Sequence, residues 1–136
     1  MFFGINTKSL TFPESGPLIP FYPGSYYDLD TILNYNLKSI TIPDGVTTVG
    51  GFGNCAGLRK IILSNTLEGI GSDAFSNCYS LTSITIPETV TYLGNSCFDW
   101  CHSLQFIKFL SMTPPSCAGD TSPIGNIPEK CVIYVP

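Results

Sequence analysis

A repeat with a period of 23 residues constrains this chain more than any other feature of its sequence. The step separates Leu58, Leu81 and Leu104. Other columns keep the same register: Ile61, Ile84 and Ile107; Phe52, Phe75 and Phe98; Cys55, Cys78 and Cys101; Gly71 and Gly94. A further copy starts at Leu37, 21 residues before Leu58, because two residues are missing between Gly50 and Phe52. Such a period is typical of a solenoid, in which each copy forms one coil.

The pattern inside one copy predicts short strands. Residues 37–42 alternate apolar and polar side chains and include β-branched types, which indicates a half-buried strand. Pro43 ends this strand because proline has no N–H for the sheet. Residues 46–50 predict a second extended piece, closed by a glycine that permits positive φ. The spacing of the apolar side chains in residues 72–78 predicts a short helical or 3₁₀ turn.

Stacked copies bury their apolar edges against one another, because a single coil has no core of its own. The leucine, isoleucine, phenylalanine and cysteine columns should therefore form one continuous core. Three of the six cysteines, Cys55, Cys78 and Cys101, belong to these columns, and we expect them to be buried free thiols. The sequence thus predicts a mostly β solenoid.

The repeats resemble the BspA-like leucine-rich repeat family. The segments 37–43, 74–78, 81–87 and 90–94 carry the resemblance, and the endings 113–115 and 133–136 are similar to the cap that often closes such arrays. The resemblance covers residues 37–136. It implies a right-handed stack of leucine-rich coils of about 23 residues, with short strands and short helical turns, capped at both ends. It also implies protein binding, often on bacterial or protist surfaces.

Three segments follow from this reading. We expect an N-terminal capping segment over residues 1–36, leucine-rich repeats over 37–109 and a C-terminal cap over 110–136. Within the first segment, residues 9–13 echo the strand of the repeat. The tyrosine-rich stretch 21–27 is expected to form an aromatic lid over the first coil, and its alternative role is a second contact surface.

Composition excludes several classes of protein. Hydrophobic types make up 43% of the residues and charged types 12%, the reverse of a disordered chain. A net charge of −4 without a basic cluster disfavours nucleic acid as a ligand. No apolar run approaches the roughly 20 residues of a membrane-spanning helix, so we expect no membrane insertion.

The sequence does not predict an enzyme, a metal site or a cofactor. Cys97, Cys101, Cys117 and Cys131 lack the tight pairing of structural zinc sites, although a Cys117–Cys131 disulfide stays open. His102 occupies a solvent-facing position of the repeat, away from any nucleophile that we can name. No glycine-rich phosphate loop follows a strand.

The outward positions of the predicted strands form the candidate binding face, consisting of Ser39, Thr41, Lys60, Ile62, Ser83, Thr85, Phe106 and Lys108. These residues predict a flat, weakly charged surface rich in hydroxyls, with Ile62 and Phe106 as apolar anchors for a protein partner of unknown identity. The alternative is that these two side chains only suit a strand, or lie beneath an end segment.

Two functions therefore remain after the sequence analysis. The first is a non-enzymatic protein-interaction or adhesion module; the second is a structural subunit of a virion or other assembly, in which the repeat is a rigid spacer and the chain oligomerises. Residues 1–6 lack the basic start and apolar run of a secretory signal. We expect a cell-surface or secreted location if the chain belongs to a longer protein, and an intracellular or virion-associated one otherwise.

Overall fold

The computed structural model describes residues 9–10, 37–117, 119 and 122–136. The expected N-terminal cap and its tyrosine-rich lid lie outside these residues, apart from the strand at 9–10. The described strands are β1 (Ser9–Leu10), β2 (Ser39–Thr41), β3 (Thr48–Val49), β4 (Lys60–Ile62), β5 (Gly69–Ile70), β6 (Ser83–Ile86), β7 (Tyr92–Leu93), β8 (Phe106–Phe109), β9 (Ser116–Cys117) and β10 (Val132–Tyr134). All their pairings are parallel.

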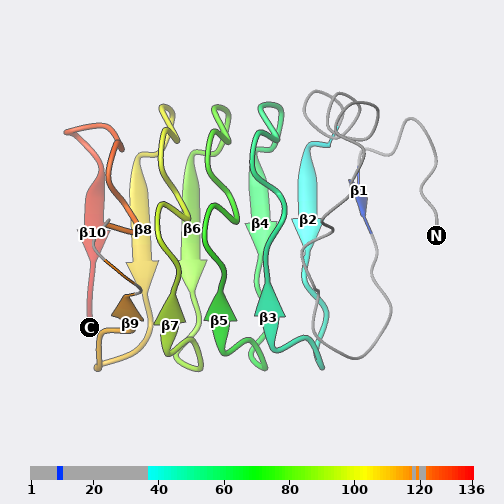
Figure 1. Cartoon of the computed structure of the whole chain (residues 1–136), viewed down its shortest axis with the longest axis vertical. Helices are drawn as coiled ribbons and strands as arrows, with labels where there is room; N and C mark the ends of the chain where they lie inside the picture. Colours follow the sequence, from blue (N-terminus) through cyan, green and yellow to red (C-terminus); the bar gives the residue numbers. More distant parts are fainter. Residues whose placement is uncertain (1–8, 11–36, 118, 120–121) are drawn as a thin grey trace.

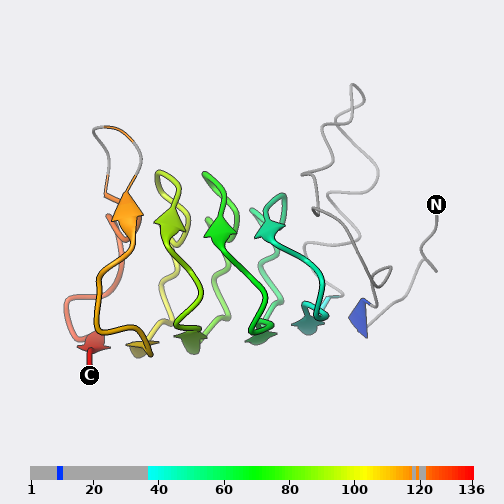
Figure 2. The same cartoon turned by 90° about the horizontal axis from the view of Figure 1, so that it is seen from below.

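The described coils stack side by side, and each contributes strands to two sides of the stack (Figures 1 and 2). One side consists of two three-stranded sheets, in the orders β1-β2-β4 and β6-β8-β10. The other side is a single four-stranded sheet in the order β3-β5-β7-β9. Parallel strands that are far apart in sequence lie next to each other, as a coil of about 23 residues requires. The predicted β solenoid is confirmed.

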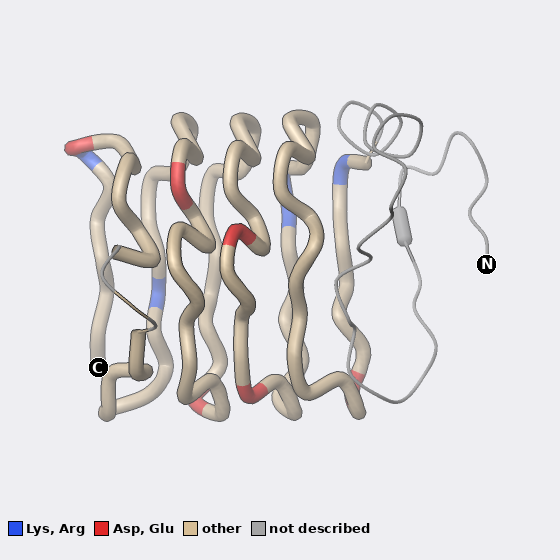
Figure 3. The backbone as a smooth tube through the Cα atoms, in the orientation of Figure 1, with Lys and Arg blue, Asp and Glu red and all other residues tan. Residues whose placement is uncertain are grey.

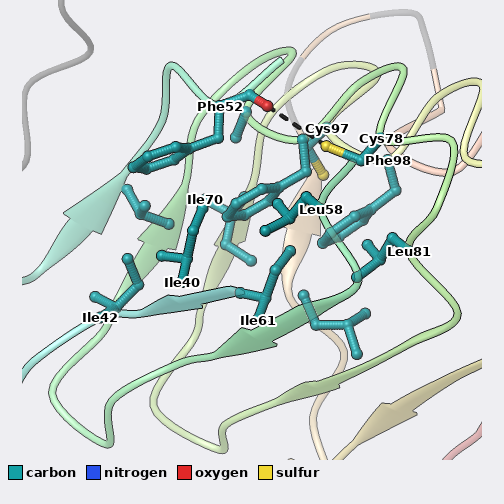
Figure 4. Close-up of a cluster of buried hydrophobic side chains, with 14 of the residues drawn as sticks. Ile40, Ile42, Phe52, Leu58, Ile61, Ile70, Cys78, Leu81, Cys97 and Phe98 are labelled. Atoms are coloured by element: carbon teal, nitrogen blue, oxygen red, sulfur yellow. Dashed lines mark hydrogen bonds between the residues drawn. The ribbon is translucent and has the colours of Figure 1, made fainter. Parts of the chain in front are cut away.

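The repeat columns pack between the two sides and form one core (Figure 4). In register, Ile40 lies beside Ile61, and Ile84 lies beside Ile107. The rings of Phe52, Phe75 and Phe98 stack in a row, with centroids 5.9 and 5.8 Å apart and planes within 10° of parallel. Each copy of the repeat thus places its large apolar side chains directly on those of its neighbours.

The cysteine column belongs to this core. Cys55, Cys78 and Cys101 are buried free thiols. The Sγ of Cys78 donates to the carbonyl oxygen of Phe52 at 3.4 Å, and the Sγ of Cys101 donates to that of Phe75 at 3.3 Å. A thiol therefore links each coil to the coil before it, and the inward position expected for this column is confirmed.

Thiol labelling of the native protein should separate the cysteines sharply. Burial raises the pKa of the Cys101 thiol to about 12 and raises the pKa of Cys78 well above its usual range. Because the thiolate is the reactive form, these residues should stay unmodified while the exposed Cys117 reacts quickly. Mass spectrometry over time, with and without urea, measures this. Rapid modification of both Cys55 and Cys78 without denaturant would contradict the inward column.

The segment 72–78 forms a run of hydrogen-bonded turns instead of the expected short helical or 3₁₀ turn. The backbone N–H groups of Asp73, Phe75 and Asn77 donate to carbonyl oxygens of the next coil, at 2.8–2.9 Å. Asp73 and Asn77 also have positive φ, at 53° and 58°. A helix needs these N–H groups for its own turns, so hydrogen bonding between coils replaces helical hydrogen bonding.

The repeat glycines have a different role from the expected one. The described glycines with positive φ are Gly45, Gly51 and Gly119, so the column that contains Gly50, Gly71 and Gly94 does not use this freedom. At Gly94 an added Cβ would collide with the backbone of Ser72 in the preceding coil. Close approach of two coils, and not an unusual φ, requires glycine here.

The segment 110–136 continues both sides of the stack. Its strand β9 pairs with β7, and β10 pairs with β8 over Phe106–Lys108. Ile133 lies in register with the inward Ile107 but is 43% exposed, because no described strand covers the outer edge of β10. The described part of the solenoid therefore ends on an open strand edge.

Candidate functional site

The structure places all eight residues of the candidate binding face on the outer surface of the side formed by β2, β4, β6 and β8. Their inward neighbours in the alternation are buried isoleucines, such as Ile40 and Ile84. Ile62 is 45% exposed and Phe106 is 39% exposed, so neither apolar side chain lies beneath a described segment. Ser39 and Ser83 are half-buried, and the other four residues are exposed.

Strand β10 extends this face beyond the residues that the sequence singled out. Val132 lies beside Phe106, and Tyr134 lies beside Lys108, both with their side chains exposed. The rings of Phe106 and Tyr134 meet edge to face, with centroids 6.1 Å apart. The alternation of residues 132–135 carries this signal, although these residues belong to the expected C-terminal cap. The C-terminal half of the face is therefore more apolar than expected.

The described basic residues gather along one side of the molecule (Figure 3). The described basic residues are Lys38, Arg59, Lys60, Lys108 and Lys130, and each lies in β2, β4, β8 or β10 or within two residues of one of them. The described acidic residues are Asp44, Glu68, Asp73, Glu88, Asp99 and Glu129. None of them lies in a strand of this side, and by the same two-residue criterion only Glu88, after β6, lies close to one. The candidate face is therefore locally cationic, although the chain has a net charge of −4.

The face is split between β4 and β6, which lie farther apart than the other neighbouring strands of this side (Figure 1). These two strands belong to separate sheets, and no ladder joins them in the described part of the chain. A groove of about 400 Å³ lies here, lined on one side by Arg59, Lys60 and Ile62 and on the other by Ser83 and Thr85. The same two coils pair normally on the other side, through β5 and β7.

A second group of exposed rings lies along the turns between the two sides. Tyr79 stacks on His102 with centroids 5.5 Å apart, and Trp100 meets His102 edge to face at 5.6 Å. Trp100 has a φ of 59° in the column where Asn54 and Asn77 also have positive φ. His102 is exposed, as its repeat position predicts.

The remaining cysteines do not form a site. Cys117 and Cys131 are free thiols, so the structure contains no disulfide between them. Cys97 is buried, and its Sγ donates to the carbonyl oxygen of Pro123 at 3.6 Å. Within the described residues, no group of three or more histidine, cysteine or acidic side chains has an arrangement that holds a metal ion. The described part of the chain also lacks a helix with the length and apolar character to span a membrane.

Comparison with known proteins identifies the family of these coils. Residues 30–117 match the family model described as "BspA type Leucine rich repeat region (6 copies)", and this match spans more than half of the chain. The chain belongs to the BspA-type leucine-rich repeat family. The columns of leucine, isoleucine and phenylalanine that stack in the core are thus the repeat of this family.

Two solved structures are similar to this BspA-type chain. A leucine-rich cell surface protein from Faecalibacterium prausnitzii A2-165 is 33% identical, with a TM-score of 0.56 over 63% of this chain and 23% of that one. A leucine-rich repeat protein from Bacteroides ovatus ATCC 8483 is 24% identical, with a TM-score of 0.46 over 74% of this chain and 27% of that one. The chain thus spans about a quarter of each. No curated protein matches it.

Proposed function

We propose that this protein is a non-enzymatic interaction module that binds a protein partner through the face formed by β2, β4, β6, β8 and β10. The observation that carries the proposal is the exposure of apolar anchors along one side of the solenoid: Ile62, Phe106, Val132 and Tyr134 are each 39–53% exposed. Exposed aromatic side chains are common anchors of protein interfaces. The similarity to a leucine-rich cell surface protein supports display on a cell surface. Adhesion is the role that we propose for a module displayed in this way.

Substituting both central anchors should remove binding while the fold stays intact. Ile62→Asp with Phe106→Asp places two carboxylates where the partner would bury apolar side chains, and we expect a loss of at least about a hundredfold in affinity. Proteins that the immobilised wild-type chain captures, and the double variant does not, would be identified by quantitative mass spectrometry. Each would then be purified and titrated against the wild-type and variant chains by calorimetry.

The matched control places the same change on the opposite side of the solenoid. Thr48 and Tyr92 are exposed residues of β3 and β7, and Thr48→Asp with Tyr92→Asp should leave binding unchanged. Circular dichroism of both double variants checks the fold. If every purified partner binds the Ile62/Phe106 variant as tightly as the wild type, this face is not the binding site.

A structural subunit of an assembly, such as a virion, is the second candidate function. The outer edge of β10 favours it, because no strand among the described residues pairs with this edge, and backbone groups beside the exposed Ile133 and Val135 are a template for pairing with another chain. Multi-angle light scattering on the isolated chain tests this candidate. A monomer at all accessible concentrations would speak against an obligate assembly, whereas a discrete oligomer that Ile133→Lys dissolves would support it.

A further inference from the structure

The groove between β4 and β6 lies where the hydrogen-bonded ladder of this side is interrupted. The N–H of Lys60 donates toward β2, and the carbonyl oxygen of Ile62 accepts from there, at 3.3 and 2.8 Å. Because backbone groups alternate in direction along a strand, the N–H and C=O of Ile61 point toward β6. No ladder partner meets them there in the described residues.

The other wall of the groove has the same character. The carbonyl oxygens of Thr82 and Ile86 accept hydrogen bonds from the β8 coil, at 2.8 and 3.0 Å. The same alternation directs the backbone groups of Ser83 and Thr85 toward β4. The Cα atoms of the two walls lie within 8 Å of each other at several positions, which leaves no room for a further strand between them. The hydroxyls of Ser83 and Thr85, which line the groove, can each donate and accept hydrogen bonds. A peptide carries both complementary groups, whereas a phosphate or sulfate polymer satisfies only the donors.

Charge decides which kind of peptide fits. Arg59 and Lys60 line the groove at the start of β4, and both side chains are exposed. The nearest acidic residue along β6 is Glu88, in the turn after the strand and therefore at the opposite end of the groove. A carboxylate beside the two cations would form charge-assisted hydrogen bonds, and the guanidinium of Arg59 can hold it with two parallel N–H groups.

We propose that the groove between β4 and β6 binds an extended acidic segment of the protein partner. The inference rests on the proposed function of this face and adds the chemistry of the partner. An aspartate or glutamate side chain lies against Arg59 and Lys60, and the backbone of the segment exchanges hydrogen bonds with the hydroxyls of Ser83 and Thr85. Ile62, at the rim, contacts the apolar residues that flank the acidic segment.

Three short synthetic peptides of equal length test the proposal against the full chain. One alternates glutamate with threonine, one glutamine with threonine and one lysine with threonine, each with a fluorescent label for anisotropy titration at low salt. We expect the glutamate peptide to bind at least about tenfold more tightly than the glutamine peptide and the lysine peptide to bind more weakly still, because each charge-assisted bond removed is worth a factor of this order.

Variants localise the effect to the groove. Arg59→Ser with Lys60→Ser should weaken the glutamate peptide by about tenfold or more, whereas Lys108→Ser with Lys130→Ser, which removes the same charge elsewhere on this side, should weaken it by less than about threefold. Thr85→Tyr keeps the charge and fills the groove, so it should also weaken binding. Circular dichroism confirms that each variant is folded.

Several outcomes would overturn the proposal. Equal affinity for the glutamate and glutamine peptides would exclude a charge-selective site. Equal losses of glutamate-peptide affinity in the two double-serine variants would show that the peptide responds only to the overall positive charge of this side and not to the groove. Heparin that competes more effectively than the glutamate peptide would indicate a polyanion surface. These outcomes can be distinguished from failure of the proposed function. If a partner binds in a way that depends on Ile62 and Phe106 but the glutamate peptide does not bind, the proposed acidic segment is refuted and the proposed binding face is not.

Discussion

Replacing Phe75 with alanine should lower the free energy of unfolding by about 3–5 kcal/mol. The side chain is fully buried and lies between two other rings, with its centroid 5.9 Å from that of Phe52 and 5.8 Å from that of Phe98. Its removal leaves a cavity between two coils and ends two aromatic contacts at once. Because neighbouring coils stabilise each other, a loss of this size is a large part of the 5–15 kcal/mol typical of a domain.

Urea unfolding followed by circular dichroism measures this loss, and Phe106→Ala provides the matched control. Phe106 is the same residue type and lies in β8, but its side chain points outward and is 39% exposed. We expect it to cost less than about 1 kcal/mol. Similar costs for Phe75→Ala and Phe106→Ala would mean that the phenylalanine column does not hold the coils together.

The core of this protein could be predicted because each core position recurs, with the same type of residue, in several copies of the repeat. Leu58, Leu81 and Leu104 are all buried, as are Phe75 and Phe98, and every one of them occupies the column that its spacing assigned. Periodicity reports which side chains face inward, since equivalent positions in a stack have equivalent surroundings. The local path of the turns was less predictable, because hydrogen bonds to the next coil compete with those of a helix.

The candidate face was predictable in its orientation but not in its extent or its electrostatics. Alternation in the strands identified outward residues such as Ile62 and Thr85. The split between β4 and β6 has no counterpart in the alternation, which is the same in both strands. The period fails after Phe109, so the pairing of β10 with β8 could not be read from spacing. Net charge averages over the surface and therefore conceals the basic residues that gather on one side.

The substitution Gly94→Ala should destabilise the solenoid by about 3 kcal/mol or more, the upper part of the range for overpacking. An added Cβ would lie 2.6 Å from the Cα of Ser72 and closer still to the peptide bond between Gly71 and Ser72. These are backbone atoms of the preceding coil, which cannot turn away as a side chain can. Moving the coils apart would also strain the hydrogen bond from the N–H of Gly94 to the carbonyl oxygen of Ile70, at 2.7 Å.

Gly69→Ala is the matched control for this prediction, because both glycines are buried in neighbouring coils of the same side. A Cβ at Gly69 would lie 3.6 Å from Cδ1 of Tyr92, which is ordinary van der Waals contact. Both substitutions lower the conformational entropy of the unfolded chain, which stabilises the folded protein by about 0.4–1 kcal/mol in each case. The difference between their free energies of unfolding in urea therefore measures the cost of the collision in the folded state. If the Gly94→Ala and Gly69→Ala variants have the same free energy of unfolding, the close approach of the coils does not require glycine at position 94.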